Sequence, residues 1–379
     1  MSEARDAVFT FAFETWQDAQ IRGMFRGSDR LVTSLAEHPS IGQLVIANPF
    51  RSWPVAAVRR LQGAPSFQPP PGALVQPYRW QRDDVRWARW VERDYHHYAR
   101  AVRRAADRAG LQRPAFVTCN PVIAGFADLS WAHSVTYYAR DDWAAHPDYR
   151  RQWPLICEAY SRFGSGGVRV CAVSQIIADR LGPLAHCAVV PNGIAPDEWL
   201  DPPDPPGWFT ALPRPRVVYV GSLDARIDPV AVGAISQAIQ GGSVVFLGPM
   251  MDAAHFAPIR TLHNVTIRPH ADRPAVVGVV AAADCGMLPH ARSGLTEAMS
   301  PLKLYEYLAG GAPVVATDLP PVRGVDDRAL TVGEPSGFGD AVRAALEMGR
   351  SLEDDRRAFV AANSWRSRHD RVVDMMLDA

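Results

Sequence analysis

Lysine is almost absent from this sequence. Its 379 residues include 40 basic side chains, of which 39 are arginine and only one, Lys303, is lysine. An equal number of acidic residues brings the net charge to zero. This balance excludes nucleic acid as the main partner, because neutralising phosphates needs a surplus of basic side chains. The preference for arginine is typical of a GC-rich genome and says little about function. The position of the single lysine is more informative, because its compact ammonium differs chemically from a guanidinium.

Long hydrophobic runs and paired cysteines are also missing. The longest apolar stretch, 275–283, is far shorter than the roughly 20 residues of a membrane-spanning helix. The five cysteines form no Cys-x-x-Cys pair and no His-x-x-x-His pattern occurs, so we expect neither a thioredoxin motif nor a metal site. The first residues are polar and acidic, unlike a secretory signal, and we therefore expect a cytoplasmic protein.

Short apolar runs alternate with longer segments of helical character in both halves of the chain. This rhythm is typical of βαβ units, in which parallel strands are buried between helices on both faces of a sheet. We predict strands at 7–13, 43–47, 114–118, 134–138, 168–173 and 188–190, and again at 217–220, 243–247, 265–267, 285–288, 313–316 and 329–332.

Seven prolines gather between these two series of strands, within residues 196–215. Proline at this density disfavours both a helix and an interior strand. We therefore predict a linker at 196–215, which joins an N-terminal domain, residues 1–195, to a second α/β domain, residues 216–361.

Residues 79–113 depart from this rhythm, since they hold ten arginines and three tryptophans. Trp87, Val91, Tyr95 and Val102 recur at helical spacing. One interpretation is an amphipathic helix that packs on the N-terminal sheet and exposes an arginine face. The other is a helix that touches an anionic membrane or a lipid-linked acceptor, which would make the protein peripheral to the inner face of the membrane.

The most informative stretch runs from Ser300 to Thr317. Ser300 suits the N-cap of a helix and Pro301 its first position, so we expect free backbone N–H groups and the positive end of the helix dipole there. Lys303 adds a full charge in the first turn, and this combination favours a phosphate group. Glu306 falls on the same face, where it could bind ribose hydroxyls; the alternative is an ordinary ion pair between Lys303 and Glu306.

The run Ser-Pro-Leu-Lys-Leu-Tyr-Glu-Tyr-Leu-Ala, followed by Pro-Val-Val-Ala-Thr at 313–317, resembles the donor-nucleotide motif of bacterial GT-B glycosyltransferases, especially those that build teichuronic-acid-like surface polysaccharides. Tyr-Val-Gly-Ser at 219–222 and Tyr-Tyr-Ala-Arg-Asp-Asp-Trp at 137–143 are similar to other motifs of that family. The resemblance implies two Rossmann-like, doubly wound domains that face each other across a cleft, with a C-terminal helix, 362–379, that completes the N-terminal domain.

The resemblance also implies a set of donor-binding residues in the second domain. Its diphosphate would lie against the glycine turn and the start of the helix, its ribose against Glu306, and its base against the turns after the next strands. Arg226 would add charge, or else be a surface residue of the following helix. The donor-binding residues implied are Gly221, Ser222, Arg226, Gly248, Pro269, Ser300, Pro301, Leu302, Lys303 and Glu306.

A glycosyl transfer also needs a base that takes the proton of the acceptor hydroxyl. Asp141 follows a predicted strand, at the carboxyl edge where open α/β sheets bind ligands, and is our first candidate. Asp142 is the second, although it could instead cap the helix expected near Trp143. His133 and His146 flank this loop and are further candidates.

We therefore predict a metal-independent glycosyltransferase that moves a sugar from a nucleoside-diphosphate sugar to a hydroxyl acceptor, with no cofactor beyond the donor itself. UDP is the favoured nucleotide, with GDP or dTDP as alternatives; Lys303 would take the place of a metal at the diphosphate. The rival interpretations are a sugar-nucleotide epimerase of the same fold and a non-catalytic nucleotide-sugar-binding subunit. Retaining members of the wider group have two glutamates eight positions apart, whereas the residue eight positions before Glu306 is Ala298. The resemblance therefore does not predict whether the anomeric configuration is retained or inverted.

Overall fold

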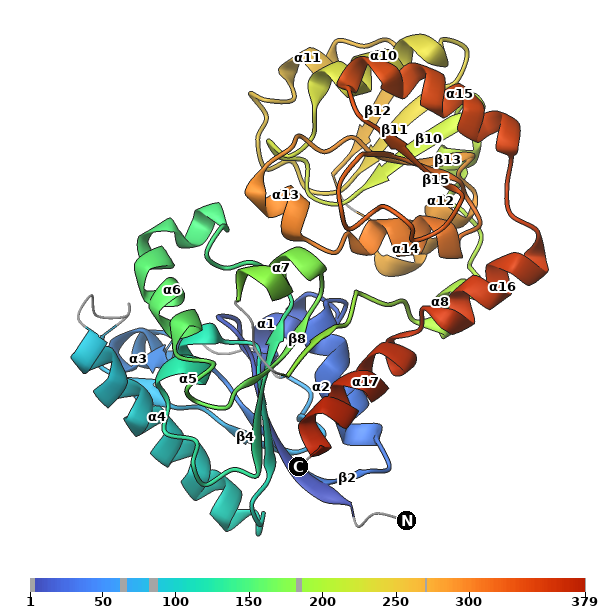
Figure 1. Cartoon of the computed structure of the whole chain (residues 1–379). Helices are drawn as coiled ribbons and strands as arrows, with labels where there is room; N and C mark the ends of the chain where they lie inside the picture. Colours follow the sequence, from blue (N-terminus) through green and yellow to red (C-terminus); the bar gives the residue numbers. More distant parts are fainter. Residues whose placement is uncertain (1–3, 62–66, 82–87, 182–185, 270, 379) are drawn as a thin grey trace. The chain divides into compact units, whose positions relative to one another are not determined.

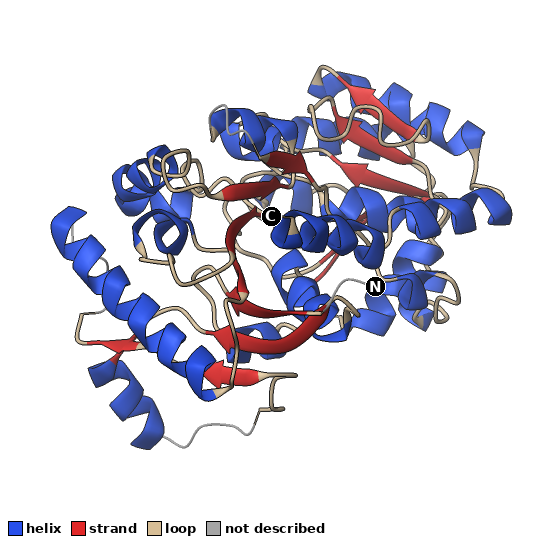
Figure 2. Cartoon of the chain, turned by 60° about the horizontal axis from the view of Figure 1, so that its bottom comes forward, coloured by secondary structure: helices blue, strands red, loops and turns tan. Residues whose placement is uncertain are grey.

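The structure is a computed structural model that describes residues 4–61, 67–81, 88–181, 186–269 and 271–378. The chain divides into two compact units. Unit 1 comprises Met1–Pro191 and Trp365–Ala379, and unit 2 comprises Asn192–Ser364. In both units helices cover a sheet whose strands all run parallel (Figure 2).

Unit 1 contains a seven-stranded sheet in the order β4-β2-β1-β6-β7-β8-β9. The chain starts in the middle of this sheet, winds to one edge and then returns to build the other, which is the doubly wound arrangement. Every strand predicted for this half is present. The strands are β1 (Arg5–Thr10), β2 (Ile41–Ala47), β4 (Ala73–Val75), β6 (Ala115–Thr118), β7 (Ser134–Ala139), β8 (Arg169–Ala172) and β9 (Cys187–Val189).

Helices cover both faces of this sheet, and α17, in red, lies beside α2, in blue (Figure 1). A short pair, β3 (Arg51–Ser52) and β5 (Tyr78–Arg79), stands apart from the main sheet. The helices of unit 1 are α1 (Trp16–Ile21), α2 (Gly27–Glu37), α3 (Trp53–Leu61), α4 (Ala88–Arg108), α5 (Pro121–Phe126), α6 (Trp153–Ser161), α7 (Gln175–Arg180) and α17 (Trp365–Leu377), with a 3₁₀ helix at Pro147–Gln152.

The arginine-rich segment forms α4, and the first of the two interpretations describes its packing. Val91, Tyr95, Tyr98 and Val102 are buried against strands β1, β2 and β6 and helix α5. The arginines of this helix at positions 93, 100, 103, 104 and 108 are exposed. Trp87, which we placed on the apolar face, lies outside the described residues.

Unit 2 repeats the arrangement with six parallel strands in the order β12-β11-β10-β13-β14-β15. All six strands predicted for this half are present, so the predicted α/β class and the doubly wound topology of both units are confirmed. The strands are β10 (Arg216–Val220), β11 (Ser243–Leu247), β12 (Val265–Arg268), β13 (Cys285–Leu288), β14 (Val314–Thr317) and β15 (Ala329–Val332).

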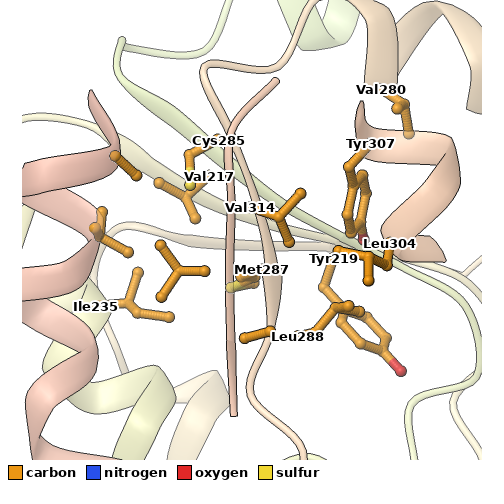
Figure 3. Close-up of a cluster of buried hydrophobic side chains, with 14 of the residues drawn as sticks. Val217, Tyr219, Ile235, Val280, Cys285, Met287, Leu288, Leu304, Tyr307 and Val314 are labelled. Carbon is orange, nitrogen blue, oxygen red and sulfur yellow. The ribbon is translucent and has the colours of Figure 1, made fainter. Parts of the chain in front are cut away.

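The core of unit 2 lies on both faces of its sheet. Figure 3 shows Ile235 of α10 on one side of the strands, and Tyr307 and Val280 on the other. All three side chains are fully buried. The helices of unit 2 are α8 (Pro196–Trp199), α9 (Gly207–Thr210), α10 (Pro229–Ala238), α11 (Ala257–Arg260), α12 (Arg273–Ala281), α13 (Gly294–Ala298), α14 (Leu302–Ala309), α15 (Phe338–Met348) and α16 (Glu353–Ala362), with a 3₁₀ helix at Pro335–Gly337.

The linker predicted at 196–215 is instead part of unit 2. The chain passes from unit 1 to unit 2 between Pro191 and Asn192, and the proline-rich segment contains the short helices α8 and α9. Trp199 and Phe209 are fully buried in the cores of this unit. Pro196 is the first residue of α8 and Pro206 the N-cap of α9, positions at which a helix needs no backbone N–H donor.

Candidate functional site

The carboxyl ends of β10 and β13 mark the topological switch point of the unit 2 sheet. Strand order reverses between these two neighbours, and open α/β sheets bind ligands in the crevice outside such a point. Gly221 directly follows β10, and His290 comes two residues after β13. The start of α14, which follows β13 in the chain, supplies Lys303 to the same place.

Two glycines shape this crevice. Gly221 has φ +130° and Gly248, after the neighbouring strand β11, has φ +147°, backbone conformations that side-chain-bearing residues rarely adopt. A Cβ on Gly248 would overlap the carbonyl of Gly221, and a Cβ on Gly221 would overlap Cε of Lys303. Because Gly221 has no Cβ, the Lys303 side chain can lie directly against the backbone of this turn. Gly248, which we expected near the base, supports this turn.

Helix α14 starts one residue later than predicted. Its N-cap is Pro301 and its first helical residue is Leu302, so Lys303 occupies the second position. Ser300 does not cap the helix; its hydroxyl accepts the backbone N–H of Asn192 at 3.1 Å, and its carbonyl accepts the Asn192 side-chain amide at 2.7 Å. These bonds hold the chain in an extended path before the helix. Leu302 and Lys303 lie in the first turn, where backbone N–H groups have no partner within the helix.

The Lys303 ammonium has no acidic partner within ion-pair distance among the described residues. Its Nζ lies 5.3 Å from the centre of the Tyr219 ring, beside the Gly221 turn. Burial, followed by repulsion from the Arg226 guanidinium, lowers the pKa of Lys303 to about 8. A positive charge held this way is stabilised by any anion that enters the crevice.

Arg226 lies in the loop before α10, not on that helix as one alternative had it. It makes a two-pronged ion pair with Asp224, with Nε to Oδ1 at 2.9 Å and Nη2 to Oδ2 at 2.7 Å. The Asp224 pKa is lowered: burial alone would raise it, but the bonds from Arg226 more than compensate. The pair fixes the loop that carries Ser222, which the resemblance assigned to the diphosphate.

Sequence reasoning missed His290, whose only signal is its place just beyond a buried strand. Its side chain is buried, and its Nε2 lies 3.5 Å from the Tyr219 hydroxyl. Burial, together with the positive charges of Lys303 and Arg226, lowers the His290 pKa to about 3, so the ring is neutral at physiological pH. A cavity of about 240 Å³ lies next to it, bordered by Arg292, Thr317 and Glu334 among others.

Glu306 is buried and does not pair with Lys303, contrary to the alternative considered for this helix. Its Oε1 lies 2.7 Å from Nη2 of Arg273, which also bonds Glu198. The Arg273 guanidinium lies 5.6 Å from the centre of the Trp199 ring. Helix α8, which lies in the segment predicted as a linker, thus provides both Glu198 and Trp199 as contacts of Arg273. Pro269 is exposed just after β12, and its neighbour His270 lies outside the described residues.

In unit 1 the two candidate carboxylates differ in their surroundings. Asp141 follows β7 at the carboxyl edge of the sheet, and 31% of its side chain is exposed. Asp142 is buried, pairs with Arg180 and accepts the Ala144 N–H at 3.2 Å, so it stabilises the local turn. His133 precedes β7 and therefore lies at the opposite edge of the sheet from Asp141.

His146 has a local structural contact. Its ring accepts the backbone N–H of Asp148 at 3.3 Å, at the start of the 3₁₀ helix. Across the described residues, no group of three or more potential metal ligands occurs. The same residues contain no helix that is both long enough and apolar enough to span a membrane.

Comparisons with known proteins define the class of fold. No family model matches this chain. Sucrose-phosphate synthase from Thermosynechococcus elongatus superimposes over 98% of both chains with a TM-score of 0.64 and 14% sequence identity. A UDP-forming trehalose-phosphate synthase from Burkholderia xenovorans, in complex with glucose-6-phosphate, covers 98% of this chain and 100% of its own, with a TM-score of 0.62 and 11% identity. The E. coli trehalose-6-phosphate protein, bound with UDP-2-fluoro glucose, covers 98% and 99%, with a TM-score of 0.66 and 11% identity.

The chain therefore has the two-domain GT-B fold of nucleotide-sugar glycosyltransferases, and the resemblance read from its motifs is confirmed at that level. Among curated proteins it is similar to the putative teichuronic acid biosynthesis glycosyltransferase TuaH of Bacillus subtilis (strain 168), with 30% identity over 106 residues. The match spans 27% of this chain and about a quarter, 26%, of TuaH.

Proposed function

We propose that this protein is a glycosyltransferase that moves a sugar from a UDP-sugar to a hydroxyl acceptor without a metal ion. The observation that carries the proposal is the Lys303 ammonium. It lies at the switch point of a doubly wound sheet and has no acidic partner among the described residues. In a fold shared with UDP-forming synthases, such a charge is suited to a diphosphate.

The chemistry asked of unit 2 is to stabilise a leaving group. When the bond between the anomeric carbon and the donor diphosphate breaks, negative charge develops on the phosphate oxygens. Lys303 and the first-turn amides of α14 would receive that charge, and Gly221 would let the backbone approach the phosphates. Glu306, held by Arg273, would offer its remaining acceptor capacity to the ribose hydroxyls.

The chemistry asked of unit 1 is to remove a proton. As the acceptor oxygen bonds to the anomeric carbon, its O–H proton passes to a base, for which we propose Asp141 because its carboxylate is accessible. Asp142, the second candidate, is committed to Arg180 and to its own turn. The solved structures with UDP-2-fluoro glucose and with glucose-6-phosphate support a donor and an acceptor of these general kinds.

Contact with an anionic membrane is a further part of the proposal. Since the apolar face of α4 is buried in unit 1, such a contact would use its exposed arginines, for example Arg100 and Arg104. Trp53 and Trp80, which are 52% and 78% exposed in the same N-terminal half of unit 1, have the ring type favoured at membrane interfaces.

The decisive experiment measures binding and turnover separately. Calorimetry with UDP, GDP and dTDP, each against wild type and K303M, tests the donor site; we expect UDP to bind tightest and K303M to weaken it. Incubation with UDP-sugars, in EDTA and with or without hydroxyl acceptors, tests transfer.

Each rival function has its own signature in these assays. Epimerised UDP-sugar in the absence of an acceptor would replace the transferase with an epimerase. Tight UDP binding with no turnover on any acceptor would indicate a binding subunit, and activity that EDTA abolishes would contradict the metal-independent mechanism. Equal UDP affinity in wild type and K303M would remove Lys303 from the site.

A further inference from the structure

Three arginines in unit 1 gather around a single carboxylate oxygen. Oε1 of Glu14 lies 2.6 Å from Nη2 of Arg140, 3.6 Å from Nη2 of Arg22 and 3.6 Å from Nη1 of Arg26. Glu14 comes just after β1 and Arg140 directly after β7, so this arginine cluster (Arg22, Arg26 and Arg140) stands at the carboxyl edge of the unit 1 sheet.

The acidic side chains at the cluster hold two of its arginines closely and the third only loosely. Arg140 is hydrogen-bonded to Glu14, and Arg22 is hydrogen-bonded to the fully buried Asp29 at 2.9 Å. Among the described residues, the one acidic contact of the Arg26 guanidinium is at 3.6 Å, to an oxygen that Arg140 already holds. Asp141 is a third carboxylate at the cluster, 3.8 Å from Arg140, but in the part of the chain that the structure describes no hydrogen bond joins any of the three carboxylates to the Arg26 guanidinium.

The geometry leaves the Arg26 guanidinium open to a ligand. Arg26 is 54% exposed, whereas Arg140 is only 8% exposed. The Nε atoms of Arg22 and Arg140 are buried and have no hydrogen-bond partner among the described residues. Burial and repulsion from Arg140 and Arg22 lower the pKa of Arg26, which is the direction expected where like charges are crowded.

An aromatic surface adjoins the cluster. The Arg140 guanidinium lies 5.1 Å from the centre of the Trp143 ring. Phe13 meets Trp143 edge to face at 5.0 Å and stacks on Tyr149 at 4.4 Å. Phe13 and Tyr149 are only partly buried, so their rings offer an apolar face beside the positive charges. A sugar ring with an acidic substituent has both complementary surfaces.

We propose that the arginine cluster binds the anionic group of an acidic acceptor, a sugar that carries a phosphate monoester or a carboxylate. This inference rests on the proposed function and adds the charge of the acceptor to it. Guanidinium groups bind either anion with paired, charge-assisted hydrogen bonds. Phe13 follows β1 and Asp141 follows β7, so the aromatic surface and the proposed base both lie at the carboxyl edge of the sheet that carries the cluster.

Calorimetry on the full chain with glucose 6-phosphate, glucuronate and uncharged glucose tests the assignment. We expect at least one of the two anionic sugars to bind and glucose to bind at least about tenfold more weakly, with an affinity for the anion that falls as salt is raised. R26Q should weaken the anionic sugar about tenfold, the loss of one charge-assisted contact. The matched control is R343Q in unit 2, because Arg343 is 56% exposed and pairs only with Asp340 among the described residues.

The outcomes separate the two acceptor types and the two proposals. Binding of glucose 6-phosphate alone identifies a phosphate acceptor, and binding of glucuronate alone a carboxylate. Equal affinity for glucose, an R26Q affinity equal to that of R343Q, or no binding of either anionic sugar or of inorganic phosphate would overturn the inference. UDP binding in the same samples reports independently on the donor site, so a protein that binds UDP but no acidic sugar loses only this inference.

Discussion

The Lys303 ammonium carries a positive charge that both its burial and the nearby Arg226 guanidinium disfavour. Its pKa is lowered from 10.5 to about 8. Below pH 8 the side chain is charged and can bind a diphosphate; as the pH rises through 8 the charge is lost, and with it the contact.

We therefore predict that UDP affinity falls between pH 7 and pH 9.5 in the wild type. K303R should remain nearly independent of pH over this range, because arginine stays protonated. K303M should bind UDP about 1–3 kcal/mol more weakly at pH 7 and show no pH dependence. Titration calorimetry at several pH values decides this, and a wild-type affinity that is flat across the range would contradict the assignment.

Replacement by asparagine should have different effects at Asp141 and Asp142, on activity at the first and on stability at the second. D141N should abolish transfer while the melting temperature and UDP affinity stay near those of the wild type, since Asp141 is accessible. D142N should lower the free energy of unfolding by about 1–3 kcal/mol, because it leaves Arg180 without its buried partner. Turnover assays and urea unfolding of both variants separate the two roles; a fully active D141N would exclude Asp141 as the base.

At the scale of elements, the turn after β10 and helix α14 depend on each other, since the Lys303 side chain packs directly on Gly221. G221A should displace the lysine and strain a backbone at φ +130°, lowering UDP affinity at least about tenfold. G233A in α10 is the control, because a Cβ there meets nothing within 4 Å. Calorimetry should find wild-type UDP affinity in G233A, and an unchanged affinity in G221A would show that the turn does not position the lysine.

Helix α4 permits a test of the membrane proposal that leaves the fold intact. Arg100 and Arg104 are exposed one turn apart, while the opposite face is buried. Each arginine near an anionic bilayer contributes about 1 kcal/mol, so R100Q/R104Q should weaken binding to phosphatidylserine vesicles by about tenfold or more. Sedimentation with neutral vesicles serves as the control, and equal binding of wild type and variant to anionic vesicles would remove α4 from any membrane contact.

At the scale of the whole molecule, the two units differ in how the chain builds them. Unit 2 is one continuous segment, whereas unit 1 needs α17 from the far end of the sequence. The Ser134 hydroxyl donates to the carbonyl of Met376 at 2.5 Å, and the His369 ring bonds the Ser34 hydroxyl at 2.6 Å.

We predict that a fragment of residues 192–364 folds alone and binds UDP, while 1–191 is markedly less stable than the same segment with α17 restored as a separate peptide. Circular dichroism and urea unfolding measure both, with calorimetry for UDP. A fragment 192–364 that folds without binding UDP would show that the nucleotide site needs unit 1.

Strand positions could be predicted because a parallel strand buried on both faces is a nearly continuous apolar run, as in residues 217–220 of β10 and 244–247 of β11. The two-residue strands β3 and β5 have no such run, and β4 has only three apolar residues, two of them exposed, so these short strands were missed. The linker was misplaced because proline density describes the backbone but not whether Trp199 and Phe209 find a core to enter. The predicted cap at Ser300 was one residue early, because a distant amide at Asn192 takes its hydroxyl.

The sequence by itself determined the two doubly wound units and singled out Lys303, because buried strands and a rare residue type leave local signatures. Only the tertiary structure decided the partners of each charge. Arg273 pairs with Glu306, and Arg180 pairs with Asp142. Glu14 lies within ion-pair distance of Arg22, Arg26 and Arg140. These pairs join residues from different helices and loops, and which charges remain unbalanced depends on distances that only the folded chain sets.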